Sequence, residues 1–265
     1  MSTDSHLLTE RQGHTLIVTL NRPEAKNAFS AEMLAGLCDA WDEANSNDEI
    51  RSVILTATGN VFCAGADLKA MNNAQDQSDS AKRFREDSGM AWRALLRSQY
   101  VRVPIIAAVE GHAVAGGTEI LQGTDIRIAG ESAIFGVVEV SRGLFPLGGS
   151  TVRLRRQIGF AKAMELLLAA ETLTAREALE CGLIGTVVPD GEALNAALKK
   201  AEKVNSCGPL AVRAVKRSVY DTNGLPEVDA LKIELEHGLP IFQTKDAKEG
   251  TKAFMEKRPA VFTGE

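Results

Sequence analysis

Two carboxylates and a pair of glycines stand out between Ala113 and Glu139. Gly116 and Gly117 open an apolar stretch that is expected to be a helix, and Glu119 follows two residues later. Glu139 comes twenty residues after Glu119 and is flanked by valines. An apolar flank of that kind raises the pKa of a carboxyl group. Two such carboxylates suit proton addition and removal next to a carbonyl group.

A second segment with the same small-residue character lies upstream at residues 62–69, Phe-Cys-Ala-Gly-Ala-Asp-Leu-Lys. The N–H group of Gly116, at the expected helix start, has no partner within the helix and carries partial positive charge. Ala66, after Gly65, can supply a second N–H group from the other loop. Together the two segments predict a site where backbone N–H groups stabilise a developing oxyanion while carboxylates move protons.

Each of these residues also has a structural interpretation. The glycine pair can serve close packing between a helix and a strand. Glu119 can belong to a buried ion pair, for which Arg127 is the candidate partner. Asp67 and Glu110 are competing acids, and Asp67 is better suited to ordering its own loop.

The elements that must position these residues follow from the apolar pattern. Ser30 is expected to cap a helix that ends at the polar cluster 45–48. Runs rich in β-branched and other apolar residues predict strands at 14–20, 51–57, 104–109, 125–129 and 132–135. Because these strands are nearly continuously apolar and alternate with helices, we expect mainly parallel pairing.

Residues 71–87 are polar and are expected to be the least ordered part of the chain, with a helix following from about 81 or 88 to 98.

The chain after Gly159 is predicted to be helical to its end. The helical pattern then covers 160–169, 174–180, 191–205, 208–222, 227–238 and 245–256. The predicted organisation is an α/β core over 1–190 and a helical region over 191–265.

Composition excludes several classes of protein. The chain has 265 residues, 45% of them hydrophobic and 25% charged, as in an ordinary globular protein, and its net charge of −5 gives no reason to expect nucleic acid. The four cysteines are scattered and the four histidines lack metal-ligand spacing, so we expect no metal site and a reduced, cytoplasmic protein. No apolar run is long enough to cross a membrane. The phosphate-binding and hydrolase motifs are absent.

The chain resembles the enoyl-CoA hydratase/isomerase (crotonase) family over nearly its whole length. The order and spacing of the matching segments make this resemblance specific. They are Asn21–Pro23 with Asn27–Ala28, 62–69, Gly111–Glu119, Phe135–Glu139, Gly143–Gly149, Ala175–Val188 and Glu249–Arg258. Segments 116–125 and 142–150 are similar to an actinobacterial branch, in which some relatives act on bulky, steroid-derived acyl chains.

The resemblance implies a fold and a reaction. The fold would be an α/β, crotonase-like spiral of ββα units with a helical C-terminal region that builds trimers, commonly paired into hexamers. The reaction would be reversible hydration of a trans-2-enoyl-CoA to a 3-hydroxyacyl-CoA. No cofactor is expected, because coenzyme A is part of the substrate, and the expected partners are this acyl-CoA and further copies of the chain.

The resemblance also assigns the site residues. Ala66 and Gly116 would be the oxyanion-hole donors. Glu139 would deliver a proton to Cα, and Glu119 would orient the water and help to deprotonate it. Coenzyme A would lie along Ala25, Ala64, Asp67, Leu68 and Lys69, and its adenosine end would meet Phe254 and Lys257, which a neighbouring subunit could supply.

Two departures from the family pattern concern the acyl substrate more than the reaction. Val138 precedes the second glutamate where proline is usual, and Leu147 replaces a glycine common beside the water site. Retention of both glutamates favours hydration over two alternatives on the same scaffold, an enoyl-CoA isomerase and a carnitinyl-CoA-type dehydratase. The non-enzymatic alternative is an acyl-CoA-binding trimer that has lost its chemistry.

Overall fold

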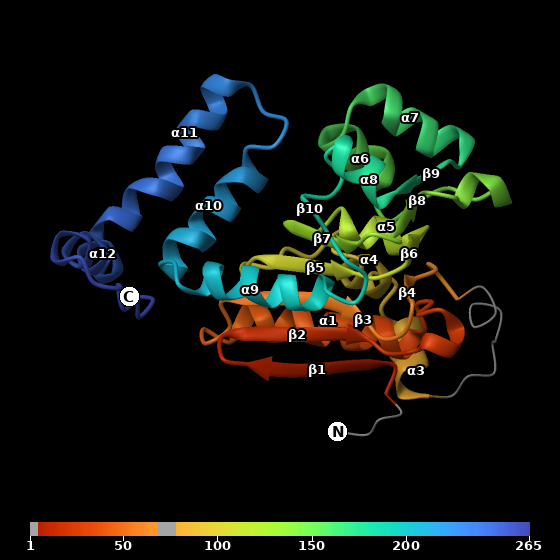
Figure 1. The fold of residues 1–265 in the computed structure, drawn as a ribbon, viewed down its shortest axis with the longest axis horizontal. Coiled ribbons are helices and arrows are strands. Elements are labelled where there is room, and N and C mark those ends of the chain that lie inside the picture. Colours follow the sequence, from red (N-terminus) through yellow and green to blue (C-terminus); the bar gives the residue numbers. More distant parts are fainter. Residues whose placement is uncertain (1–4, 68–77) are drawn as a thin grey trace.

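Two sheets form the centre of the protein (Figure 1). The computed structural model describes residues 5–67 and 78–265. The larger sheet has the strand order β1-β2-β3-β5-β7-β10, formed by Leu7–Gln12, Thr15–Leu20, Ser52–Ala57, Ile105–Val109, Ile126–Gly130 and Thr186–Val188. All its pairs are parallel except β1 with β2, which confirms the predicted parallel pairing. The edge strand β1 was not expected, because the N-terminal segment is polar and only Leu7 of this strand is buried.

The smaller sheet is built from short strands that follow the long ones. Its order is β4-β6-β8-β9, formed by Val61–Cys63, His112–Val114, Ile134–Gly136 and Thr172–Thr174. The strand pairs β3–β4, β5–β6 and β7–β8 each run from the large sheet directly into the small one. Helical segments follow these pairs, so the expected repetition of ββα units is present.

Helices cover both faces of the large sheet. The long helix α1 begins after Ser30, whose hydroxyl accepts the Met33 N–H as expected of an N-cap. The helices are α1 (Ala31–Ser46), α3 (Asp79–Glu86), α4 (Met90–Ala94), α5 (Gly116–Leu121), α6 (Ser150–Gln157), α7 (Phe160–Ala169), α8 (Ala175–Glu180), α9 (Ala193–Asn205), α10 (Pro209–Asp221), α11 (Glu227–Gly238) and α12 (Lys245–Glu256). Short 3₁₀ segments are η1 (Pro23–Ala25), η2 (Glu139–Arg142) and η3 (Leu239–Gln243).

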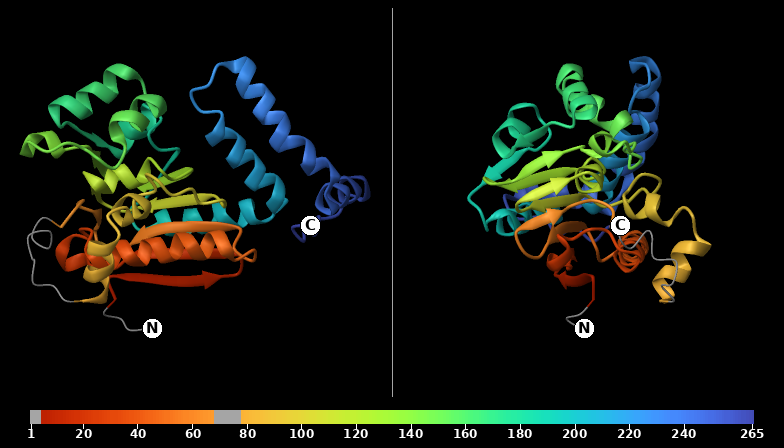
Figure 2. Two further views of the ribbon diagram at one scale, coloured as in Figure 1. Left: turned by 180° about the vertical axis from the view of Figure 1, so that it is seen from behind. Right: turned by 90° about the vertical axis from the view of Figure 1, so that its right-hand side faces the viewer.

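The two faces of the large sheet have separate cores because successive strand residues point to opposite sides. On one face, Leu16, Val18, Val53 and Leu55 belong to the main core with α1. On the other face, isoleucines meet alanines that recur every four residues on α9; the isoleucines are Ile17, Ile54, Ile106 and Ile128, and the alanines are Ala193, Ala197 and Ala201. Figure 2 shows α1 and α9 on opposite faces.

The polar region before β5 differs in part from expectation. Residues 79–86 of the segment expected to be least ordered form α3, capped by the Ser78 hydroxyl. The rest of that prediction, at 71–77, lies outside the described residues. The single helix expected up to residue 98 is broken into α3 and α4, because the Asp87 carboxylate accepts the Gly89 N–H and closes a turn there.

The C-terminal helices depart from the core after α9. Figure 1 shows α10 and α11 as a hairpin that projects away from the sheets, with α12 beyond it. Helix α11 buries none of its residues within the chain. Helix α9, which follows residue 190, packs on the large sheet. The predicted division of the chain at residue 190 into an α/β core and a helical region stays a prediction. No helix in the described ranges is long and apolar enough to span a membrane.

Candidate active site

The turn into α5 places Gly116 and Glu119. Ala115, before the helix, has φ 51° and ψ −127°, a conformation that is rarely adopted by a residue with a side chain. It is held there because the Ala115 N–H donates to Gly136 O at 2.8 Å. The Thr118 hydroxyl donates to Ala113 O at 2.5 Å and accepts from the Gly136 N–H at 3.0 Å. The start of α5 is thereby tied to the strand that leads to Glu139.

Ala66 forms an isolated parallel bridge with Phe29 in which its own N–H group takes no part. Phe29 N donates to Gly65 O at 2.8 Å, and Asp67 N donates to Phe29 O at 3.3 Å. Within residues 5–67 and 78–265, neither the Ala66 N–H nor the Gly116 N–H donates a hydrogen bond. Both groups therefore remain available as donors.

The two donor segments are in direct contact. Gly65 has φ +92°, and a Cβ added to it would lie 3.1 Å from Gly116 N. A Cβ on Gly117 would lie 2.3 Å from Cys63 O. The structural interpretation of the glycine pair is confirmed for Gly117, which allows the close approach. The functional interpretation stays a prediction, with which the unpaired N–H of Gly116 among the described residues is consistent.

The side chain of Glu119, a residue of α5, is buried against the start of α6. Its side chain is 4% exposed, and its Oε1 accepts from the Ser150 N–H at 3.3 Å. A Cβ on Gly148 would lie 2.6 Å from Glu119 Oε2, so this carboxylate lies directly against the backbone. The suggested ion pair with Arg127 is wrong, because that guanidinium donates to the backbone oxygens of Leu183 at 2.6 Å and Thr124 at 3.1 Å.

Glu139 opens η2 and is half-buried. Burial raises the pKa of its carboxyl group to about 7, and the negative charge of nearby Glu119 adds to this effect. Its Oε2 is buried and has no hydrogen-bond partner among the residues that the structure describes. The two glutamates are thus close enough for their charges to interact, and among the described residues the buried Oε2 of Glu139 accepts no hydrogen bond.

The competing acids have structural partners. Glu110 Oε1 accepts from Gly191 N and Ala193 N, both at 3.0 Å, at the start of α9. Asp67 pairs with Arg22, Nη1 to Oδ2 at 2.5 Å. This pair joins the loop after Ala66 to the turn before η1 and confirms that Asp67 orders its loop. In the described part of the chain no cluster of His, Cys, Asp or Glu could hold a metal ion.

The residues expected along coenzyme A fall into two groups. Ala25, Ala64 and Asp67 lie on adjoining loops, joined by the hydrogen bond from Ala64 N to Lys26 O at 3.1 Å and by the pairing of Asp67 with Arg22. Leu68 and Lys69 lie outside the described residues. Phe254 and Lys257 lie on and just after α12, at the opposite end of the chain's fold (Figure 1), and the Phe254 side chain is 85% exposed.

Ser150, Gly148 and Gln122 were missed from the sequence. Ser150 donates to Glu119, Gly148 borders it, and the Gln122 amide donates to Ser150 Oγ at 2.8 Å. The Gly-Gly-Ser sequence at 148–150 signalled a helix start, but nothing in it pointed to the glutamate whose carboxylate would occupy that start.

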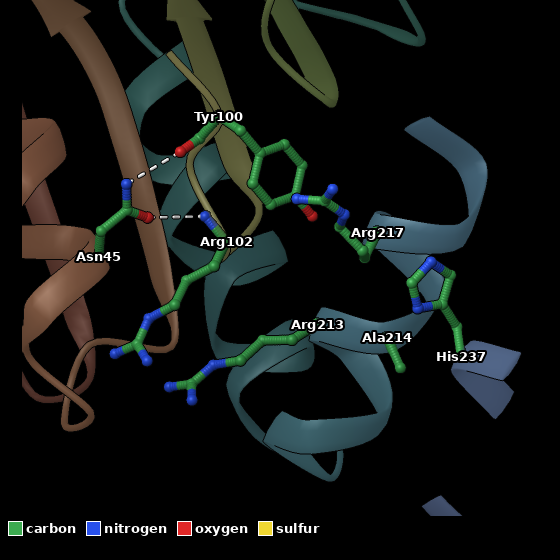
Figure 3. A pocket seen from close by; sticks show the side chains of 7 residues that line it. All are labelled: Asn45, Tyr100, Arg102, Arg213, Ala214, Arg217 and His237. Atoms are coloured by element: carbon green, nitrogen blue, oxygen red, sulfur yellow. Dashed lines mark hydrogen bonds between the residues drawn. The ribbon is translucent and has the colours of Figure 1, made fainter. Parts of the chain in front are cut away.

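A cavity of about 470 Å³ lies elsewhere, between the core and the C-terminal helices (Figure 3). On the core side of the cavity, the Asn45 side chain donates a hydrogen bond to Tyr100 O and accepts one from Arg102 N, each at 2.9 Å. Its charged groups are paired: Arg102 and Arg213 contact Asp48, and Arg217 and His237 contact Asp221. None of the sequence-predicted site residues lines it. Its lining is Asn45, Tyr100, Arg102, Arg213, Ala214, Arg217 and His237.

Comparison with known proteins gives a consistent result. The sequence profile described as enoyl-CoA hydratase/isomerase matches residues 10–265. The chain is 52% identical over 257 residues to enoyl-CoA hydratase EchA19 of Mycobacterium tuberculosis, covering 96% of this chain and 95% of the relative. It is 34% identical to 2,3-dehydroadipyl-CoA hydratase of Escherichia coli, covering 98% of this chain and 99% of the relative.

The fold is shared with solved structures as well. The crystal structure of enoyl-CoA hydratase EchA1 from Mycobacterium marinum superposes with a TM-score of 0.90 at 38% identity, covering 99% of this chain and 100% of the other. An enoyl-CoA hydratase from Bacillus anthracis gives the same TM-score at 34% identity, covering 98% and 100% of the two chains.

Proposed function

The chain belongs to the enoyl-CoA hydratase/isomerase family, and from this premise we propose that Ala66, Gly116, Glu119 and Glu139 form its catalytic site. The reaction is hydration of a trans-2-enoyl-CoA to a 3-hydroxyacyl-CoA. One observation carries the assignment of the site: the buried Glu119 and the half-buried Glu139 are close enough for their charges to interact, and Glu119 lies on the short helix that Gly116 opens. Among the described residues, the N–H groups of Gly116 and Ala66 donate to nothing.

The arrangement supports a specific role for each group. As the water oxygen bonds to C3, electrons move onto the thioester oxygen, and the N–H groups of Ala66 and Gly116 stabilise that oxyanion by several kcal/mol. Glu119 takes a proton from the water. Glu139 gives its proton to Cα as the enolate collapses. Its raised pKa supports this role, because a carboxyl that titrates near pH 7 keeps a proton that it can donate.

The substrate is held through its coenzyme A part, and no further cofactor takes part. We assign Ala25, Ala64 and Asp67 to its expected path, together with Leu68 and Lys69, which lie outside the described residues. Phe254 and Lys257 lie on and just after α12, which Figure 1 shows on the other side of the molecule from the elements that carry this group. We therefore assign them to the adenosine end of the acyl-CoA bound by a neighbouring subunit.

A trimer, alone or paired as a hexamer, would supply those residues. Its support is the exposed apolar surface of the C-terminal helices, where α11 and α12 present Val228, Leu231, Leu235, Phe254 and Met255 to solvent in the single chain. An assembly would bury these side chains. Sedimentation equilibrium of the full chain measures the mass that decides between trimer and hexamer. A cytoplasmic location stays a prediction.

The pH dependence of the reaction should reflect the glutamate pair. The active pair holds one proton, which Glu139 carries before hydration and Glu119 carries after it. We expect kcat/KM to fall about tenfold per pH unit above about pH 7, where Glu139 loses its proton. The same profile must appear for dehydration, because the overall reaction neither releases nor consumes a proton. Initial rates in both directions measure this; a kcat/KM that stays constant up to pH 9 contradicts it.

The reaction itself is tested by mass spectrometry. The protein is incubated with enoyl-CoA thioesters from crotonyl through long-chain to a steroid side-chain thioester, with a Glu119→Gln/Glu139→Gln double variant as control. We expect some members to gain the mass of one water with the wild-type protein alone, and the initial rates rank the acyl groups. An unchanged mass with a new chromatographic retention time would instead identify double-bond isomerisation.

A further inference from the structure

Glu119 depends on a single donor for its orientation. Within the described part of the chain, its carboxylate accepts a hydrogen bond from the Ser150 N–H alone, and at 3.3 Å this bond is long. Gly148 leaves no space on the neighbouring side, since an added Cβ would lie within 2.8 Å of three Glu119 atoms. The position of Ser150, the first residue of α6, therefore determines where this carboxylate lies.

Gln122 holds both ends of α6. Its amide Nε2 donates to the Ser150 hydroxyl at 2.8 Å, at the start of the helix. Its backbone oxygen accepts from the amide of Gln157, the last residue of the helix, at 2.9 Å. Because Gln122 follows Glu119 by three residues, it lies near the same side of the α5 segment. One residue thus fixes α6 against the element that carries Glu119.

This arrangement is unfavourable as a purely structural device. Gln122 is 2% exposed and Ser150 is fully buried. The Gln122 Oε1 atom is buried with no partner in residues 5–67 and 78–265. If the amide is turned the other way, its NH₂ group faces the same lack of a partner, so one polar end stays unpaired in either assignment. Leaving a buried polar group unpaired destabilises a fold, and an apolar side chain of the same length would avoid that cost.

We infer that Gln122 is a positioning residue for the hydration reaction: through Ser150 and α6 it holds the Ser150 N–H group on the Glu119 carboxylate. The inference rests on the proposed function, because it concerns the carboxylate that receives the proton of water. It adds a residue that touches neither substrate nor the reacting atoms. A buried amide that costs stability is retained here because it sets the geometry of a catalytic group.

The test replaces Gln122 by methionine, which keeps the length of the side chain and removes its polar atoms. We expect kcat for hydration to fall about 10- to 100-fold, since a small misplacement of a catalytic group has effects of this size. KM should stay within about twofold because the binding groups are untouched. The Tm should change little, because removal of the unpaired Gln122 Oε1 offsets the loss of the donor to the buried Ser150 hydroxyl. Gln99→Met is the matched control, because Gln99 bonds Asp42 on the surface, and it should match the wild type.

Ser150→Ala supplies a second arm. It removes the hydroxyl that accepts from Gln122 and keeps the backbone N–H that bonds Glu119. If Gln122 acts through Ser150, this variant loses a similar factor in kcat, and the Gln122→Met/Ser150→Ala double variant loses no more than the worse single variant. Independent, additive losses would overturn the coupling between the two residues.

The outcomes separate this inference from the proposed function. If the wild-type protein hydrates an enoyl-CoA and Gln122→Met keeps kcat within twofold, the inference is overturned and the proposed function stands. A Tm that falls together with kcat also overturns it, because Gln122 would then be structural. If the wild-type protein adds water to no thioester, the proposed function fails and the positioning role fails with it.

Discussion

Replacing Glu139 by glutamine is expected to lower kcat for hydration by about 10²- to 10⁴-fold, the usual contribution of a general acid or base. Glutamine keeps the shape and the polarity of the side chain but has no proton of comparable acidity to give to Cα. The fall should appear in kcat and kcat/KM together, because the proton transfer belongs to the transition state. Initial rates with the best thioester from the mass-spectrometric survey measure it.

The same substitution should stabilise the protein at alkaline pH. Folding raises the Glu139 pKa from 4.5 to about 7. Between these two values the folded state binds more protons than the unfolded state, so the free energy of unfolding falls as the pH rises from about 4.5 to 7 and stays low above that. The full shift corresponds to about 3 kcal/mol. Partial exposure of the side chain reduces it to about 1–2 kcal/mol.

Glutamine cannot ionise, so it avoids this cost. The Tm of Glu139→Gln should equal that of the wild type near pH 5 and exceed it at pH 8. Glu119→Gln serves as the matched variant for the second carboxylate. It should also lower turnover strongly, although its amide oxygen can still accept the hydrogen bond from the Ser150 N–H. Near-normal turnover in either variant would contradict the assignment of the pair, and a Tm difference independent of pH would contradict the ionisation argument.

The sequence points to the chemical groups of the proposed site more readily than to the contacts that hold them. Glu119, Glu139, Ala66 and Gly116 are identifiable because glycine pairs and carboxylates in apolar surroundings are local patterns. The long strands and Ser30 as an N-cap are local patterns in the same sense. Each is decided by residues within a few positions of one another.

Contacts between distant segments could not be predicted in this way. The three-residue strands β4, β6 and β9 are too short for a periodic pattern, and their existence depends on the neighbours with which they pair. Arg127 had a charge that suited Glu119, but its hydrogen bonds go to backbone oxygens. The link from Gln122 through Ser150 to Glu119 spans about thirty residues and follows only from the packing of α6 on α5.

Gly117→Ala is expected to damage the oxyanion hole as severely as loss of a donor. The new Cβ would lie 2.3 Å from Cys63 O and 3.0 Å from Cys63 C, which are backbone atoms that cannot turn aside as a side chain would. Relief requires that β4 and α5 move apart. Since Ala66 follows β4 and Gly116 begins α5, that movement separates the two N–H groups. Misplacing one donor should lower kcat/KM by about 10²- to 10³-fold.

Whether Gly117→Ala raises or lowers the free energy of unfolding shows whether the new Cβ is overpacked. Alanine ordinarily stabilises a helix relative to glycine by about 0.5–1 kcal/mol. Gly238→Ala, at the end of α11 with nothing within 4 Å of the added Cβ, should show this small gain and keep wild-type activity. Gly117→Ala should instead lose about 1–3 kcal/mol through overpacking.

Kinetics measured well below the Tm of both variants then distinguish a misaligned site from an unfolded one. Normal kcat/KM in folded Gly117→Ala would mean that the contact between Gly117 and Cys63 does not set the spacing of the donors. A large loss in the folded variant would mean that close packing at Gly117 and the free N–H of Gly116 serve one purpose, because the first brings the second to the place where the oxyanion forms.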